Sequence, residues 1–238
     1  MASTRISLTD GKPMVVGSIG GSADLQAVDP LESARNCDLL EIRLDLLARD
    51  GIRFETAPWR RFADLPALFT ARRIEEGGAL PLDAAERCAL LESVLNDAAL
   101  IDVEVASIGE MESLLALANG RGIPWIASFH DFGKVPDGGT LAEAAFLAKQ
   151  AGAAAFKAAA RVHQPADLAR LAEFQLADHG IPVATMGMGP LAPVSRLLCA
   201  QCGSVLNYGY LGETPTAPGQ WDAGSLKAAI AGLEPFRI

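Results

Sequence analysis

The 238-residue chain has few cysteines, few histidines and no long hydrophobic run. No stretch approaches the roughly 18 to 20 consecutive apolar residues that span a bilayer, and no apolar signal core follows the N-terminus. We therefore expect no membrane partner and a mature chain that starts at or near Met1. Four cysteines in a chain without secretory features indicate reduced thiols, which are typical of a cytoplasmic protein.

The same scarcity argues against a metal centre. Cys199 and Cys202 form a CxxC pair, but a structural zinc site takes four ligands and the sequence has no second pair. His163 and His179 occupy polar positions that flank expected helices, which leaves His130 as the remaining histidine. We expect no bound metal, and we expect the two cysteines of the pair to pack inside the protein.

Charge and loop composition exclude two further classes. The net charge is −9, the pI is near 4.8, and the twenty Lys and Arg residues are scattered along the chain. Nucleic-acid binding needs a basic face, so we expect no such partner, although a few local arginines could bind a small anion. The glycine-rich residues 17–22 have the spacing of neither a dinucleotide fingerprint nor a Walker A loop. They predict a flexible loop, and we expect no cofactor.

Short apolar runs recur at intervals too long for hairpins, and a helix-like stretch follows each of them, as in a parallel sheet. The eight candidate strands span residues 14–18, 38–44, 67–70, 99–105, 125–128, 154–157, 182–186 and 204–208, and residues 5–8 could add a small strand. Eight strand–helix units without a linker predict an α/β protein, a (β/α)8 TIM barrel that forms a single domain over residues 1–238. An open doubly wound sheet is the alternative.

Capping residues predict where several helices begin. Thr140 and Glu143 have the spacing of a capping box, and Pro165 stands where a first helical turn accepts proline. A last helix is expected from about Asp222 to Leu233.

Lys157 is the only charged residue in the apolar run of residues 153–160. Such a lysine can extend its stem along apolar surface with its ammonium in water. It can also be buried, which lowers its pKa, and a neutral amine in a dry pocket can attack a carbonyl to form a Schiff base. Only the other polar residues can decide between these alternatives.

Polar residues cluster where the expected strands end, which is the face of a barrel that carries active sites. They are Glu41 and Arg43, Arg72 and Glu76, Asp102 and Glu104, His130, Lys157, Met186 and Met188, and Arg196. Each pair alone has a structural explanation, for example an interior ion pair or an exposed i,i+4 pair. Together they favour one site.

A neutral histidine beside a Schiff-base lysine suits proton abstraction, because a protonated imine acidifies the adjacent C–H bond. His130 and Lys157 are the residues to combine in this way. Arginines at the same mouth would hold a carboxylate with bidentate geometry. Arg43, Arg72 and Arg196 are the candidates.

Motifs spread over nearly the whole chain now carry a family resemblance. They are Glu41-Ile42-Arg43-Leu44-Asp45, Phe69-Thr70-Ala71-Arg72, Glu75-Glu76-Gly77-Gly78, Ile101-Asp102-Val103-Glu104, Ser128-Phe129-His130-Asp131-Phe132, Phe156-Lys157, Met186-Gly187-Met188, Ser195-Arg196, Gly203-Ser204 and Ala217-Pro218-Gly219-Gln220. In order and spacing they resemble type I 3-dehydroquinate dehydratase, a hydro-lyase of the shikimate pathway, which supplies aromatic amino-acid biosynthesis. The resemblance implies a (β/α)8 barrel.

The resemblance also implies roles for individual residues. Lys157 would form a Schiff base with the C3 ketone of 3-dehydroquinate, His130 would move the proton from C2 and protonate the leaving C1 hydroxyl, and Glu76 would orient His130. The residues at substrate-binding positions are Glu41, Arg43, Arg72, Arg196, Thr216 and Gln220, with Met188 and Tyr208 as walls of the pocket. Residues 209–220 would form a lid that excludes water. A homodimer and a monofunctional enzyme are implied as well.

The sequence departs from the family pattern in places. Thr216 stands where many relatives have serine, the lid is one residue longer than in some relatives, and residues 158–161 are smaller and more basic than expected, which would reshape the pocket floor. Another Schiff-base barrel, such as an aldolase, would keep Lys157 but not the combination of His130 and Gln220. A non-catalytic barrel that binds a hydroxy acid would need no reactive amine.

Overall fold

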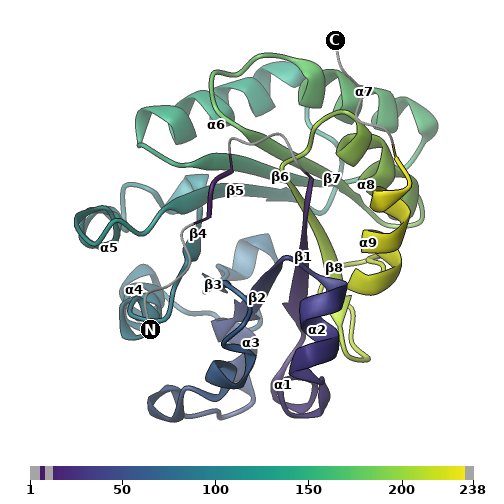
Figure 1. Ribbon diagram of the computed structural model, residues 1–238. Helices are drawn as coiled ribbons and strands as arrows, with labels where there is room; N and C mark the ends of the chain where they lie inside the picture. Colours follow the sequence, from purple (N-terminus) through teal and green to yellow (C-terminus); the bar gives the residue numbers. More distant parts are fainter. Residues whose placement is uncertain (1–5, 9–12, 234–238) are drawn as a thin grey trace.

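Strands and helices alternate along the chain in the computed structural model, which describes residues 6–8 and 13–233 (Figure 1). The eight strands are β1 (Met14–Ile19), β2 (Leu39–Arg43), β3 (Ala67–Thr70), β4 (Leu100–Glu104), β5 (Trp125–Asp131), β6 (Ala155–Arg161), β7 (Val183–Met188) and β8 (Leu206–Leu211). Each predicted strand core from residue 14 onward is present.

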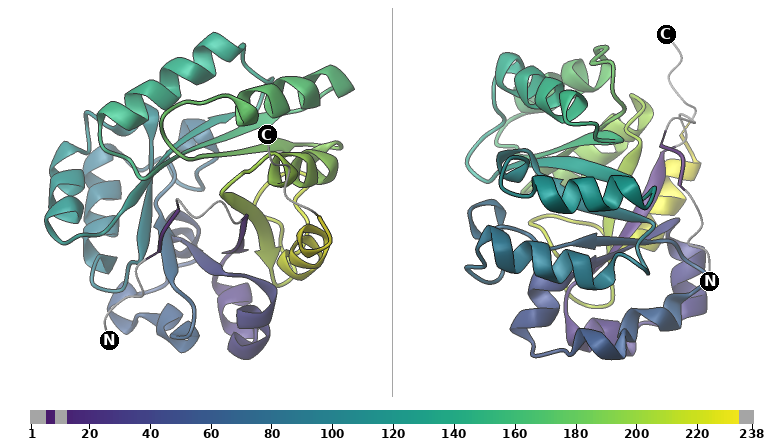
Figure 2. Two further views of the ribbon diagram at one scale, coloured as in Figure 1. Left: turned by 45° about the horizontal axis from the view of Figure 1, so that its top comes forward. Right: turned by 90° about the vertical axis from the view of Figure 1, so that its left-hand side faces the viewer.

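All ladder pairs are parallel, and the strand order is β7-β6-β5-β4-β3-β2-β1-β8. The two end strands approach each other, and the amide of Val205, just before β8, donates to the carbonyl of Val183 in β7 over 3.1 Å. The sheet therefore curls into a nearly closed barrel with helices around it, as the views in Figures 1 and 2 agree. The predicted TIM barrel is confirmed, and the open sheet is excluded.

The connections contain both α-helices and short 3-10 turns. The α-helices are α1 (Ser22–Ala27), α2 (Pro30–Asn36), α3 (Leu44–Arg49), α4 (Ala84–Val94), α5 (Glu112–Gly120), α6 (Gly138–Gln150), α7 (Pro165–Leu176), α8 (Ala192–Gln201) and α9 (Ala223–Ala231). The 3-10 turns are η1 (Phe54–Thr56), η2 (Pro58–Phe62), η3 (Ile74–Glu76) and η4 (Val105–Ser107). The predicted proline at the start of α7 and the predicted last helix are confirmed.

Side chains of each strand alternate between two environments. Outward residues such as Phe156 and Ala158 of β6 join the large core between the sheet and the helices. Inward residues such as Ala155 pack with Leu8 in a second cluster inside the barrel. Because strands buried on both faces gain stability from apolar side chains, the sequence shows them as nearly continuous apolar runs. The polar exceptions point into the barrel toward the carboxyl ends of the strands.

Several predicted boundaries are wrong. Residues 17–19 belong to β1 rather than to a flexible loop, and Ile6–Leu8 form no strand, while Arg5 lies outside the described residues. Strand β6 continues past Lys157 to Arg161, because the small residues that follow the lysine pair in register with both neighbouring strands. Helix α6 begins at Gly138 with Asp137 as its N-cap, whose carboxylate accepts from the amide of Thr140.

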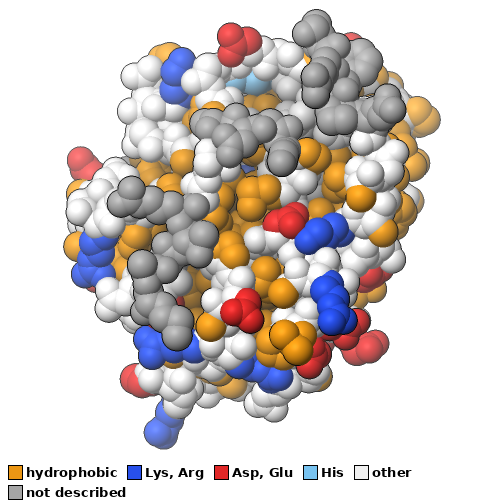
Figure 3. Space-filling view, in the orientation of Figure 1, with side chains coloured by type: hydrophobic (Ala, Val, Ile, Leu, Met, Phe, Trp, Pro, Cys, Tyr) orange, Lys and Arg blue, Asp and Glu red, His pale blue; other side chains and the backbone are white. Residues whose placement is uncertain are grey.

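Figure 3 shows one face of the molecule, on which the visible Lys and Arg side chains are interspersed with Asp and Glu. In the part of the chain that the structure describes, no helix has the length and hydrophobicity needed to cross a membrane.

Candidate active site

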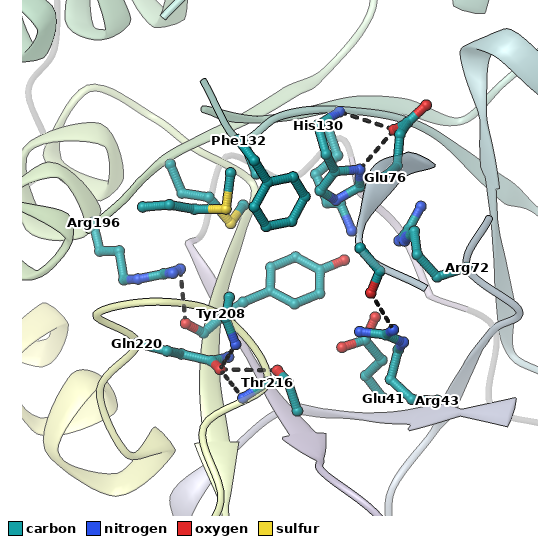
Figure 4. A pocket seen from close by; sticks show the side chains of 16 residues that line it. Glu41, Arg43, Arg72, Glu76, His130, Phe132, Arg196, Tyr208, Thr216 and Gln220 are labelled. Atoms are coloured by element: carbon teal, nitrogen blue, oxygen red, sulfur yellow. Dashed lines mark hydrogen bonds and ion pairs between the residues drawn. The ribbon is translucent and has the colours of Figure 1, made fainter. Parts of the chain in front are cut away.

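One pocket opens at the carboxyl ends of the strands, and all eleven residues predicted for the site line it (Figure 4). They are Glu41, Arg43, Arg72, Glu76, His130, Lys157, Met188, Arg196, Tyr208, Thr216 and Gln220. Gly77, Phe132, Ala159, Met186 and Ala217 complete the lining. The geometry thus brings together residues that lie up to 179 positions apart, from Glu41 to Gln220.

Lys157 is buried, with 3% of its surface exposed. Its position in β6 directs the side chain into the barrel, where Nζ lies 2.7 Å from Oδ2 of Asp102 and 4.5 Å from the centre of the Tyr208 ring. Burial lowers the pKa of Lys157, Asp102 opposes the shift, and Arg72 adds to it. A lysine held in this way supplies more neutral amine at neutral pH than an exposed one. The stem does not carry the ammonium to solvent, so the alternative of an exposed head is wrong.

His130 is the second reactive group of the pocket. Glu76 Oε2 lies 2.9 Å from both the backbone nitrogen and Nδ1 of His130. Burial, helped by Arg72 and Lys157, lowers the pKa of His130 well below its usual value. The ring is therefore neutral at pH 7, and with Nδ1–H donating to Glu76, the other nitrogen Nε2 is left as an acceptor.

The Glu76 carboxyl group, which accepts from His130, has an unusual environment itself. Burial raises its pKa to about 7, even though Arg72 opposes the shift. Glu76 ends the 3-10 turn η3, and Gly77 follows it in the left-handed region with φ +88°. A side chain at Gly77 would also collide with the Phe132 ring, 2.6 Å from the built Cβ position. This turn therefore needs glycine, and it holds Glu76 within hydrogen-bonding distance of His130.

Arg72 and Asp102 form a buried ion pair next to Lys157. Arg72 Nη1 lies 3.0 Å from Asp102 Oδ1, and it donates to Ser128 Oγ over 2.6 Å. Burial by itself would raise the pKa of Asp102, but Arg72 and Lys157 outweigh burial and hold that pKa well below its usual range. Asp102 is thus a permanent anion beside the lysine.

Glu41 and Arg43, two residues apart on β2, are also held by neighbours. Glu41 accepts from the hydroxyl of Ser18 over 2.5 Å and from that of Thr70 over 2.9 Å. Arg43 forms a two-point pair with Asp45, at 2.9 and 2.7 Å. Both side chains are therefore preorganised at the pocket wall before any ligand binds.

Arg196 and Tyr208 have unused hydrogen-bonding capacity. Arg196 is 1% exposed, and Nη1 donates to the carbonyl of Tyr208 over 2.9 Å. Its Nε and the Tyr208 hydroxyl are buried without a hydrogen-bond partner. Burial lowers the pKa of Arg196 to about 10, so the side chain remains a cation at neutral pH. Buried polar groups are normally paired, so these atoms mark the place where a polar ligand fits.

Of the residues predicted to form a lid, 209–220, the first three belong to strand β8. Gln220 Oε1 accepts from the amide and hydroxyl of Thr216, both over 2.8 Å. Pro218 accepts from the amide of Gly189 over 2.9 Å, which joins this loop to the end of β7. Gly219 has φ +74°, and a Cβ there would lie 2.2 Å from the Gly189 carbonyl oxygen, so this contact requires glycine.

Sequence reasoning gave no role to three residues that shape the site. The sequence places Asp102 in the polar cluster at the strand ends but assigns it no contact with Lys157, although its position two residues before Glu104 puts both side chains on the same side of the strand. Ser128 lies two residues before His130 on the same side of β5 and contacts Asp102 over 2.5 Å. Phe132, known only from its motif, forms a wall of the pocket.

The other candidate ligands lie elsewhere. Cys199 is buried and Cys202 is half-buried, and both are free thiols. Within residues 6–8 and 13–233, no group of three or more His, Cys, Asp or Glu side chains is arranged to hold a metal ion.

Comparisons with known proteins agree with this geometry. A model of the type I 3-dehydroquinase family matches residues 18–234. The chain is 31% identical to the 3-dehydroquinate dehydratase of Methanothrix thermoacetophila, over 92% of this chain and 91% of that protein. It is also 31% identical to the 3-dehydroquinate dehydratase of Shouchella clausii, over 94% of each chain.

A solved structure extends the similarity to three dimensions. The crystal structure of 3-dehydroquinate dehydratase from Geobacillus kaustophilus superposes with a TM-score of 0.83 at 27% identity, over 92% of this chain and 90% of that one. The chain therefore belongs to the type I 3-dehydroquinase family, a family of hydro-lyases.

Proposed function

We propose that this protein dehydrates 3-dehydroquinate to 3-dehydroshikimate, a step of the shikimate pathway, through a Schiff base on Lys157. The observation that carries the proposal is the buried Lys157 amine, 2.7 Å from Asp102, in the same pocket as a neutral His130. A reactive amine and a base at one mouth suit imine formation followed by proton transfer.

The first steps make the imine. The neutral amine of Lys157 attacks the C3 ketone, and the carbinolamine loses its hydroxyl as water to leave a protonated imine. Asp102 is the permanent anion beside the nitrogen, so it stabilises the positive charge that develops there. No external cofactor is needed, because the imine itself withdraws electrons.

The next steps remove water from the substrate. Nε2 of His130 takes the proton from C2, and the electron pair moves into the C2–C3 bond as the imine becomes an enamine. The pair then returns to expel the C1 hydroxyl, which receives the proton from His130 and departs as water. Glu76 stabilises the imidazolium between these two transfers, since it accepts the Nδ1–H bond. Hydrolysis of the resulting imine frees Lys157 and the ketone.

The remaining residues of the pocket bind and orient the substrate. Arg196 pairs with the substrate carboxylate, because its buried guanidinium has a donor without a protein partner. Glu41, Arg43 and Gln220 engage the hydroxyls. Residues 212–220 act as the lid, and their contact with the end of β7 keeps water out while the imine exists.

The substitution Arg196→Met tests the assignment of the carboxylate. We expect KM for 3-dehydroquinate to rise about 100-fold, because hydrogen bonds to charged groups contribute roughly 1.5 to 3 kcal/mol. The effect on kcat should be smaller. Steady-state kinetics measure both constants, and Arg121→Met on the exposed surface is the matched control. An unchanged KM would remove Arg196 from the binding site.

The proposed function as a whole is tested by trapping the imine. The protein is mixed with 3-dehydroquinate and borohydride, its intact mass is measured, and the modified peptide is mapped. A ligand-sized mass increment on Lys157 is expected. A folded protein with no increment would reject this substrate or this chemistry, and it would favour an aldolase or a binding protein instead. The homodimer and the cytoplasmic location stay predictions.

A further inference from the structure

A buried arginine outside the pocket connects helix α4 to the reactive lysine. Arg87 is 3% exposed although it lies on α4, a helix on the outside of the barrel (Figure 1). Its Nη1 donates to Oε2 of Glu104 over 2.7 Å, and its Nη2 donates to the hydroxyl of Ser107 over 3.1 Å. Nothing in the proposed mechanism uses Arg87 or Glu104.

The other carboxylate oxygen of Glu104 contacts the loop that follows β3. Oε1 of Glu104 accepts from Arg72 Nη1 over 2.9 Å and from the backbone amide of Arg73 over 3.0 Å. Glu104 is 1% exposed, so its charge is compensated by arginines rather than by water. The carboxylate thus bridges Arg87 and Arg72.

One nitrogen atom of Arg72 is shared among three acceptors. Nη1 lies 2.9 Å from Glu104, 3.0 Å from Asp102 and 2.6 Å from the Ser128 hydroxyl. Asp102 in turn holds Lys157 through its other oxygen. Charges of alternating sign therefore run without a break from Arg87 through Glu104, Arg72 and Asp102 to the lysine.

Because this nitrogen is shared, the strength of its contact with Asp102 depends on how strongly Glu104 attracts it. Arg87 takes up part of the negative charge of Glu104, which leaves Arg72 free to stay against Asp102. We propose that Arg87, acting through Glu104, is a positioning residue that holds Arg72 against Asp102 and thereby keeps Lys157 reactive. This inference rests on the proposed Schiff-base function.

The sign of the effect follows from the groups that face the lysine. They are Glu41 from β2, Arg72 from the loop after β3, Asp102 from β4, His130 from β5 and the Tyr208 ring from β8. Loss of the Arg87 charge removes a cation from this series of alternating charges, which favours the ammonium form of Lys157. It also lets Glu104 draw Arg72 away, so that Asp102 stabilises the ammonium more strongly. Both effects raise the pKa of Lys157.

The test measures the titration of Lys157 without substrate. Cyanate carbamylates only unprotonated amines, so the pH dependence of labelling at Lys157, followed by peptide mass, gives the midpoint of its titration. For Arg87→Met we expect this midpoint to rise by about one pH unit, and kcat/KM at pH 7 to fall about 10-fold and to recover toward higher pH. A merely structural defect would not recover with pH.

Matched variants separate an effect that acts through Glu104 from a general structural defect. In the double variant Arg87→Met with Glu104→Gln, both buried charges are absent, and we expect the midpoint to return close to that of the wild type. Arg121→Met, on the exposed surface, should leave the midpoint unchanged. A midpoint that does not move in Arg87→Met, or that moves equally in the double variant, would overturn the proposal.

Two further results keep the test decisive. If Arg87→Met does not fold, Glu104→Gln alone tests the same series of charges. Removal of this anion should lower the titration midpoint of Lys157, and an unchanged midpoint would contradict the proposal. If the wild-type protein does not turn over 3-dehydroquinate, the proposed function fails, while the labelling result still decides the role of Arg87.

Discussion

Substitution of Lys157 by methionine is expected to abolish dehydration, with turnover reduced on the order of 10⁵-fold or more. Methionine keeps the length of the side chain but has no amine, so no imine can form and the C2 proton loses the electron sink that acidifies it. The loss should appear in kcat, because the arginines and Glu41 that bind the substrate remain in place.

The protein should stay folded in this variant. Asp102 keeps its contacts with Arg72 and Ser128, so it is not left as an uncompensated buried anion. Two further measurements accompany the kinetics. The thermal unfolding temperature should be close to that of the wild type, and the intact mass after borohydride treatment should show no adduct. Lys149→Met, at an exposed position of α6, is the matched control and should keep full activity.

Substantial turnover by a folded Lys157→Met protein would exclude the covalent route. The buried ion pair of Lys157 with Asp102 would then have a structural explanation. Retained binding without turnover in both the variant and the wild type would instead favour a binding protein.

The barrel could be predicted because its pattern is local. Each strand shows a short apolar run and each helix shows its own stripe, so the alternation is visible without knowledge of distant contacts. Strand ends were less predictable. The small residues Ala158, Ala159 and Ala160 suit either a strand or a loop, and only their pairing with β5 and β7 makes them part of a strand.

The reactive residues could be predicted because polar side chains interrupt strands, where burial of an unpaired polar group is costly. The same sequence could not show which charges share a partner. Glu104 binds Arg72 and Arg87, which come from β3's loop and from α4, and these contacts depend on how the helix packs against the barrel. The sequence pattern of α4 alone does not distinguish Arg87 from an exposed helical arginine.

Substitution of His130 by alanine should separate imine formation from proton transfer. We expect kcat to fall about 10³-fold, the range in which a positioned general acid–base group contributes. Borohydride should still trap a ligand-sized adduct on Lys157, because the amine and Asp102 are untouched. The variant would thus combine a normal mass increment with almost no product, a result that Lys157→Met cannot give.

The geometry around His130 allows a sharper version of this experiment. The backbone amide of His130 donates to Glu76 in addition to the ring, so Glu76 keeps an anchor when the ring is removed. The space left by the ring adjoins the open pocket, and added imidazole should enter it and restore part of the turnover in proportion to its concentration.

The matched control is His163→Ala, which should neither lose activity nor respond to imidazole. Among the described hydrogen bonds of its side chain, the His163 ring contacts only the carbonyl of Gly133. If His130→Ala forms no adduct, the histidine is needed before the imine exists, and the division of roles between His130 and Lys157 is wrong; if it keeps full turnover, another group in the pocket is the base.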